Sequence, residues 1–171
     1  MARKKSRQKK DAKKVKKKQT KLQKETVSSQ AGEEVPIVAK KKTLKETLYF
    51  TETHEWIKVV GNEGYIGITD YAVKKLTDLV HIELPDVGDE IVQGNPFGSI
   101  ESVKAVSDLN APVSGKVLEV NEEVITNLDL ISTEPYDEGW LIKISILDPT
   151  EFDSLMIKKD YENYIKTIEE E

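Results

Sequence analysis

The sequence has 171 residues and contains no cysteine, two histidines and two methionines. Without cysteine, the chain can form no disulfide, no thiolate metal site and no cysteine nucleophile. Because His54 and His81 are the only histidines, side chains that converge on a metal ion are not expected. No apolar run approaches the length of a bilayer span, and no signal-peptide core is present. We therefore expect a cytoplasmic protein without membrane association.

Charge is distributed very unevenly along the chain. Residues 1–45 hold 17 of the 26 Lys and Arg residues but 4 of the 31 Asp and Glu residues. Residues 46–171 are correspondingly acidic, with 9 basic and 27 acidic side chains. Because the basic segment has few large apolar side chains, we expect a disordered tail over residues 1–45 and a folded domain over residues 46–171. The tail could serve nucleic acid or another anionic surface, or stay solvated without a partner.

The first half of the acidic body has the pattern of short strands. Residues 56–60 and 65–69 are rich in β-formers, and the Gly-rich turn over residues 61–64 predicts a hairpin between them. A short helix capped by Thr69 or Asp70 is expected to run to about residue 78, and residues 80–84 alternate as a strand.

Lys104 lies between two further strand-like segments, flanked by Val103 and Ala105. This spacing predicts a lysine at the tip of a β-hairpin, exposed and held by a rigid backbone. No acid or base stands next to it, so it is not expected to be catalytic. The position suits an amine that another enzyme modifies.

The C-terminal part is expected to be helical. Asp148 is a predicted N-cap with Pro149 at the first helical position, and Glu151 stands at the capping-box position. A second helix is predicted from about Asp160, with Tyr161 on its inward face. Many short strands followed by these helices predict a mainly β (α+β) sandwich or flattened barrel.

Several motifs occur in a collinear order across residues 47–165. They are His54-Glu55-Trp56, Gly67-Ile68-Thr69-Asp70, Glu83-Leu84-Pro85, Glu101-Ser102-Val103-Lys104-Ala105, Asn110-Ala111-Pro112-Val113-Ser114-Gly115 and Pro135-Tyr136-Asp137-Glu138-Gly139-Trp140. Each motif is weak alone. Together they resemble the H protein of the glycine cleavage system, a lipoyl carrier, and the basic tail is not part of that pattern.

The resemblance implies a barrel–sandwich hybrid of the lipoyl type with lipoate joined to Lys104 through an amide. Such a carrier is not itself an enzyme. Its arm passes an aminomethyl group from a pyridoxal-phosphate glycine decarboxylase to a tetrahydrofolate-dependent aminomethyltransferase, and a flavin dihydrolipoyl dehydrogenase reoxidises it. A lipoate-attaching enzyme is a further implied partner. The acidic body suits docking into basic clefts on these enzymes.

The resemblance also places side chains near the arm. Glu55 and Asp108 match acidic positions of the family's arm pocket, whereas Tyr71 stands where the family often has His. Other departures from the family pattern are Thr77 for Gly, Leu128 for Pro and Ser132 for Asn. None of them touches the attachment lysine.

Two alternatives stay open at this point. One is a related carrier that relays lipoyl groups to other complexes or serves a sulfur-oxidation pathway, because the motif around Lys104 barely separates such carriers. The other is of a different class: a nucleic-acid-binding or scaffold protein that acts through the basic tail. Biotin in place of lipoate is disfavoured, since biotin sites typically have methionine on both sides of the lysine.

Overall fold

The structure is a computed structural model that describes residues 47–170. The predicted basic tail over residues 1–45, with its nucleic-acid alternative, lies outside the described residues. Within residues 47–170, no helix combines the length and the apolar character needed to cross a membrane.

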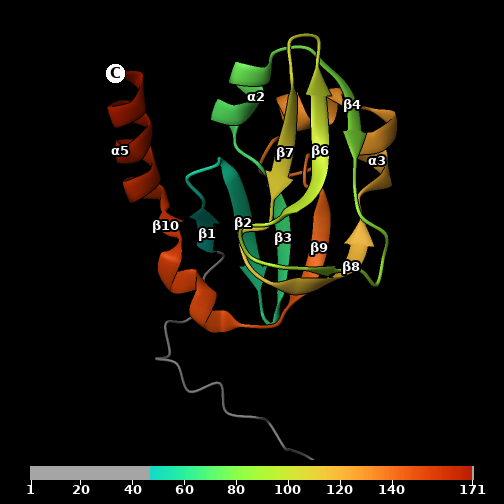
Figure 1. Cartoon of the computed structure of the whole chain (residues 1–171), viewed down its shortest axis with the longest axis vertical. Coiled ribbons are helices and arrows are strands. Elements are labelled where there is room, and N and C mark those ends of the chain that lie inside the picture. Colours follow the sequence, from blue (N-terminus) through green and yellow to red (C-terminus); the bar gives the residue numbers. More distant parts are fainter. Residues whose placement is uncertain (1–46, 171) are drawn as a thin grey trace, which may run out of the picture. The chain divides into compact units, whose positions relative to one another are not determined.

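Two antiparallel sheets form the framework of the domain (Figure 1). The strands of the larger sheet, in the order in which they pair, are β10 (Met156–Ile157), β1 (Thr47–Phe50), β2 (Glu55–Val60), β3 (Glu63–Ile68), β9 (Ile142–Ile146), β8 (Gly115–Val120) and β5 (Glu90–Ile91). The smaller sheet pairs β4 (Leu79–Glu83), β6 (Pro96–Ser102) and β7 (Val106–Asn110). The predicted mainly β sandwich is confirmed, as are the β2–β3 hairpin and the hairpin that carries Lys104.

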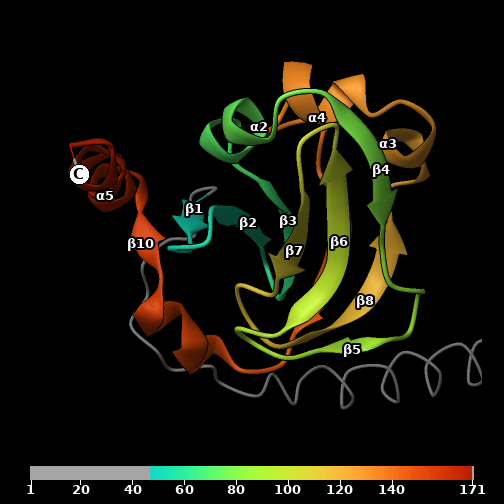
Figure 2. The same ribbon diagram turned by 45° about the horizontal axis from the view of Figure 1, so that its top comes forward.

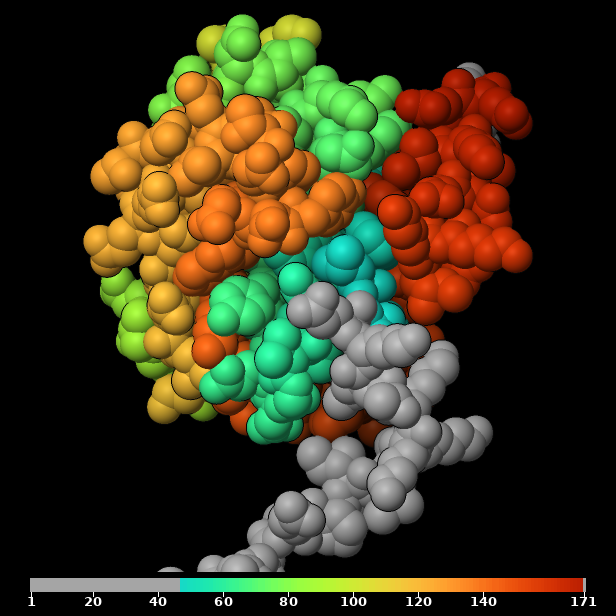
Figure 3. All heavy atoms as spheres, turned by 180° about the vertical axis from the view of Figure 1, so that it is seen from behind, coloured from blue at the N-terminus to red at the C-terminus, as the bar shows by residue number. Residues whose placement is uncertain are grey.

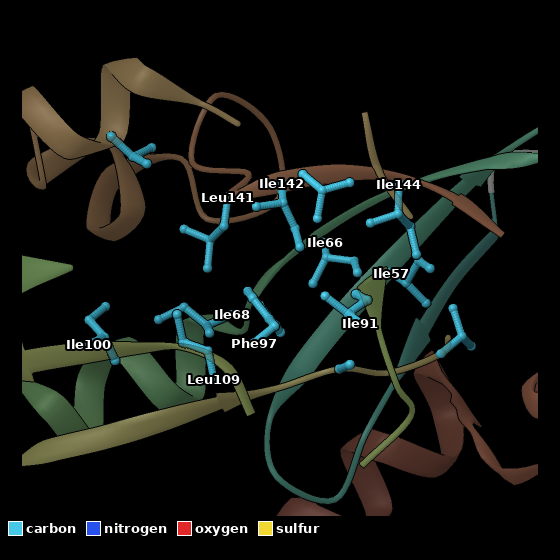
Figure 4. Close-up of a cluster of buried hydrophobic side chains, with 14 of the residues drawn as sticks. Ile57, Ile66, Ile68, Ile91, Phe97, Ile100, Leu109, Leu141, Ile142 and Ile144 are labelled. Carbon is cyan, nitrogen blue, oxygen red and sulfur yellow. The ribbon is translucent and has the colours of Figure 1, made fainter. Parts of the chain in front are cut away.

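The main core lies between the two sheets, where side chains from both meet (Figure 4). β9 shows why: Ile142, Ile144 and Ile146 alternate with polar residues, so one face of the strand turns inward. From the smaller sheet, Ile100 and Leu109 meet them, each 1% exposed. Burying one such side chain contributes roughly 1.5–3 kcal/mol, so this layer holds the β6–β7 hairpin to the rest of the domain.

A second apolar cluster joins the larger sheet to the C-terminal helix α5 (Lys158–Glu169). Tyr161 of this helix stacks on Phe50, with 4.6 Å between ring centroids, and Trp56 is fully buried beside them. The predicted inward position of Tyr161 is confirmed, although α5 begins two residues before Asp160. Seen from behind, the red C-terminal segment forms one side of the body, and the orange region of α3 (Glu122–Thr126) and α4 (Asp129–Thr133) covers the other (Figure 3).

His54 ties α5 to the start of β2 by hydrogen bonds. Its Nδ1 lies 2.8 Å from the hydroxyl of Tyr161, which also lies 2.8 Å from the hydroxyl of Thr69. Burial, aided by the positive charge of Lys75, lowers the pKa of His54 below its ordinary value, and burial raises the pKa of Tyr161 to about 12. Both groups are therefore neutral near pH 7, and His54 serves as a hydrogen-bonding residue between β2 and α5.

The segment after Asp148 forms a short 3₁₀ helix, η1 (Pro149–Ser154), with Pro149 in its first turn as predicted. The Asp148 carboxylate accepts a hydrogen bond from the Thr150 amide, so this N-cap is confirmed. The capping-box role predicted for Glu151 is wrong. Its carboxylate accepts hydrogen bonds from the amide and hydroxyl of Ser114 and not from the N-cap residue. That contact fastens η1 to the turn before β8 in place of closing the helix on itself.

Helix α2 (Asp70–Leu76) connects the two sheets and ends in a strained residue. Thr69 is the N-cap, and its hydroxyl accepts a hydrogen bond from the Ala72 amide. At the other end, Thr77 has φ 68° and ψ −127°, a region that favours glycine. Its buried hydroxyl oxygen has no hydrogen-bond partner among residues 47–170. Thr77 is the position at which the resemblance drawn from the sequence motifs leads one to expect Gly.

We expect Thr77→Gly to raise the free energy of unfolding by about 1 kcal/mol, since relief of backbone strain outweighs the entropy cost of glycine. Thr77→Ala serves as the matched variant, because it removes the unpaired hydroxyl but keeps a side chain at positive φ, so its gain should be smaller. Urea unfolding of both variants at one pH measures the difference. A Thr77→Gly protein less stable than wild type would contradict the strain.

Candidate functional site

Lys104 stands at the turn of the β6–β7 hairpin and is exposed, as predicted. The ladder pairs Ser99 with Asp108 and Glu101 with Val106, which leaves residues 103–105 as the turn. Figure 1 shows this turn at one end of the domain, next to α2 and the start of β4. Among residues 47–170, no carboxylate lies within salt-bridge distance of the Lys104 ammonium. The amine is therefore accessible to an external reagent.

Ser102 holds the backbone of this turn. Its hydroxyl accepts hydrogen bonds from the amides of Lys104 (3.2 Å) and Ala105 (3.1 Å) and donates one to the Ala105 carbonyl. The Ser102 amide donates to the same carbonyl, and the Val103 amide donates to the carbonyl of Asp78. The turn is thus fixed by its own serine and by the chain leading into β4. The sequence pattern did not predict this positioning role of Ser102, although a serine two residues before the lysine could have indicated it.

The outward face of the smaller sheet continues from the turn with polar and acidic groups. The strand register places His81, Glu101 and Val106 in one row across this face. The next row consists of Glu83, Ser99 and Asp108. Asp108 is exposed, so its carboxylate is available to a cation brought near Lys104.

Glu55 occupies a different environment from Asp108. Its side chain is 1% exposed, and its carboxylate accepts hydrogen bonds from the hydroxyls of Thr51 and Thr53 and from the Asn110 amide at 2.8 Å. Since Asn110 ends β7, Glu55 lies at the end of the strand that contains Asp108. The structure therefore brings both predicted acids to β7 but gives them different surroundings: Glu55 is enclosed by donors and Asp108 faces solvent.

Tyr71 lies on α2 and is half-buried against His54, with 4.7 Å between ring centroids. The ammonium of Lys75 lies 5.2 Å from the centre of the Tyr71 ring. These contacts place Tyr71 at the junction of α2 and α5. In this position the Tyr71 ring fills space and carries no titratable nitrogen, unlike the His that the resemblance leads one to expect.

The site has few means of performing chemistry by itself. Within the described range, no three His, Asp or Glu side chains are grouped so that they could hold a metal ion. The turn offers a primary amine, a serine engaged with the backbone, and carboxylates on the adjoining sheet face. Such an arrangement defines a sandwich domain that displays an exposed lysine on a hairpin turn.

Comparison with known proteins agrees with this class. The glycine cleavage H-protein family profile matches residues 48–168. A glycine cleavage system H protein of Carboxydothermus hydrogenoformans is 58% identical over 124 residues, covering 72% of this chain and 93% of its own. The mitochondrial H protein 2 of Arabidopsis thaliana is 49% identical over 124 residues, covering 72% of this chain and 78% of its own.

A solved structure gives the same result for the fold. The crystal structure of a glycine cleavage system H protein from Mycobacterium marinum matches with a TM-score of 0.61 at 34% identity, covering 70% of this chain and 96% of that one. The chain belongs to the glycine cleavage H-protein family. The resemblance inferred from the motifs is confirmed.

Ser102→Ala should loosen the turn, because the amides of Lys104 and Ala105 lose their acceptor. We expect a loss of about 1–2 kcal/mol in the free energy of unfolding and faster amide exchange confined to residues 102–106. Ser102→Thr, which keeps the hydroxyl, is the matched variant and should restore slow exchange. Hydrogen exchange followed by NMR measures both. Exchange in Ser102→Ala as slow as in wild type would contradict this role of the serine.

Proposed function

We propose that Lys104 carries lipoate through an amide and that the protein is the lipoyl carrier of a glycine cleavage system. The exposed, unpaired amine on a turn fixed by Ser102 is the observation that carries the proposal. Membership in the H-protein family supports it further. Amide formation removes the lysine's charge, and at this turn that change leaves no partner carboxylate unpaired within residues 47–170.

The residues around Lys104 fit a carrier that other enzymes act upon. A lipoyl group on this lysine would supply a disulfide, one sulfur of which can accept and release the aminomethyl group. The chain's own part is to present the attachment point at one end of the domain, on a backbone held by the hydrogen bonds of Ser102. Because no carboxylate of residues 47–170 lies within salt-bridge distance of the Lys104 ammonium, we assign the chemical steps to the partner enzymes and no enzymatic activity to this chain.

The partners follow from the proposed cargo. They are a pyridoxal-phosphate glycine decarboxylase, an aminomethyltransferase that uses tetrahydrofolate, a flavin dihydrolipoyl dehydrogenase and a lipoate-attaching enzyme. Each must accommodate the same hairpin end. The acidic outward face formed by Glu83, Glu101 and Asp108 suits basic groups at the docking sites of these enzymes.

For the arm pocket we propose separate tasks for the two acids. Asp108 is exposed and can face a cationic amine directly, whereas the carboxylate of Glu55 is occupied by Thr51, Thr53 and Asn110. Glu55 therefore fixes the loop at the pocket's edge. Tyr71, packed on His54, forms an aromatic wall on the α2 side.

Lys104→Arg is expected to abolish both the lipoyl mass and glycine decarboxylation, because a guanidinium is not acylated by a lipoate-attaching enzyme. Lys116→Arg, at an exposed lysine of β8, is the matched control and should keep both. Intact and peptide mass spectrometry of protein from its own host, with a decarboxylation assay in the presence of partners, gives the measurement. Full activity of Lys104→Arg would refute the proposal.

Asp108→Asn should shorten the lifetime in water of the carrier that is loaded with an aminomethyl group. A neutral amide stabilises the ammonium of that group less than a carboxylate does. We expect ammonia release to accelerate about three- to tenfold, in line with one charge-assisted hydrogen bond partly screened by solvent. Asp153→Asn, at an exposed acid on η1, controls for net charge. Equal rates in the two variants would remove Asp108 from the pocket.

A further inference from the structure

Three valines near Lys104 have side chains that are mostly exposed to solvent. Val103 is 63% exposed, Val106 is 64% exposed and Val80 is 52% exposed. None of them belongs to either apolar cluster of the domain. We call these residues the valine collar.

The strand pairing brings the collar together at one end of the smaller sheet. Val103 is in the turn, and its amide donates to the carbonyl of Asp78, two residues before Val80. Val106 is the first residue of β7 and pairs with Glu101, which pairs in turn with His81 of β4. Val80 lies at the irregularity between β4 and β6, beside the turn. Lys104 thus stands at the same end of the smaller sheet as three exposed valines.

The turn itself does not need these side chains. Ser102 and the carbonyl of Asp78 hold its backbone, and turns usually contain Gly, Asn, Asp or Ser. Exposed apolar groups that sit together and are bordered by polar residues mark contact surfaces. The border here is acidic, with exposed Asp78 and Asp108 and half-buried Glu101.

We propose that the valine collar seats against an apolar ring at the mouth of the channel through which a partner enzyme receives the arm. Basic groups outside that ring would meet the acidic border. The inference rests on the proposed carrier function and specifies the partner's surface. A contact built on three valines and their acidic border is small. Small contacts suit transient complexes, which a carrier that visits several enzymes needs.

Docking through the valine collar has two measurable consequences. The collar contributes to docking and not to the reaction, so its loss should raise KM for the carrier while kcat at saturation stays nearly the same. It is also insensitive to ionic strength, unlike the acidic border, whose contribution weakens as salt screens the charges. At a purely electrostatic docking site, the effect of a substitution on KM would disappear at high ionic strength.

The test compares Val103→Thr and Val106→Thr with Val87→Thr and Val92→Thr. Threonine keeps the branched shape and strand preference of valine and adds one hydroxyl. Val87 and Val92 are exposed to a similar degree, 63% and 54%. They flank β5, at the opposite end of β6 from the turn (Figure 2). All carriers are first lipoylated to completion, as judged by intact mass.

We expect each collar variant to raise the KM of the glycine decarboxylase for the lipoylated carrier about three- to tenfold, equally at low and high salt. The control variants should leave KM within twofold of wild type, and equal melting temperatures exclude misfolding. Glu101→Gln should raise KM at low salt only. This pattern would support the collar and its acidic border together.

Two results would overturn the inference. Fully lipoylated collar variants with the wild-type KM would show that the collar does not contact the enzyme. Sedimentation that finds a wild-type dimer, dissociated by Val106→Thr, would show that a second copy covers it. Neither outcome touches the carrier function, whose failure would appear as wild-type protein with no lipoyl mass on Lys104.

Discussion

The buried carboxylate of Glu55 is the contact that joins the parts of this site. A charge with 1% exposure is tolerated only when donors surround it. Two of those donors come from the loop before β2 and one from Asn110 at the end of β7. The larger and the smaller sheet are thus linked by polar groups as well as by the shared core. A shift of this loop would remove the two hydrogen bonds that the Glu55 carboxylate accepts from Thr51 and Thr53.

The same hairpin is fixed at its other end by different means. Ile100 and Leu109 bury its inner face, and Ser102 closes the turn with hydrogen bonds. Packing and hydrogen bonds therefore hold the backbone on both sides of Lys104, whose side chain is exposed. In the proposed carrier, this base would present the lipoyl arm to each partner enzyme in the same setting.

Local patterns predicted much of this fold. Capping preference predicted Thr69 as the start of α2, turn chemistry predicted the turn between β2 and β3, and periodicity predicted the inward face of α5. All three signals act over a few residues. β1 and β10 were not predicted, since β10 has two residues and gains its definition only by pairing with a distant strand. α3 and α4, with five residues each, are too short for a helical period to be seen. Glu151 matched the capping-box pattern, but its carboxylate found Ser114 after folding, a partner 37 residues away.

The site divides along the same line. Lys104 on its hairpin tip could be predicted because strand, turn and motif all lie within one stretch of chain. The surroundings of Glu55 and Asp108 could not, since burial depends on how two sheets meet. The collar shows the converse case: a valine in a strand-like stretch predicts a buried side chain, and only the fold reveals that Val103 and Val106 face outward. In the proposed carrier, the apolar side chains that the fold leaves outside next to Lys104 form a surface for a partner enzyme to cover. Basic groups of that partner would meet the acidic border, so that the two kinds of side chain at this end would serve the same encounter.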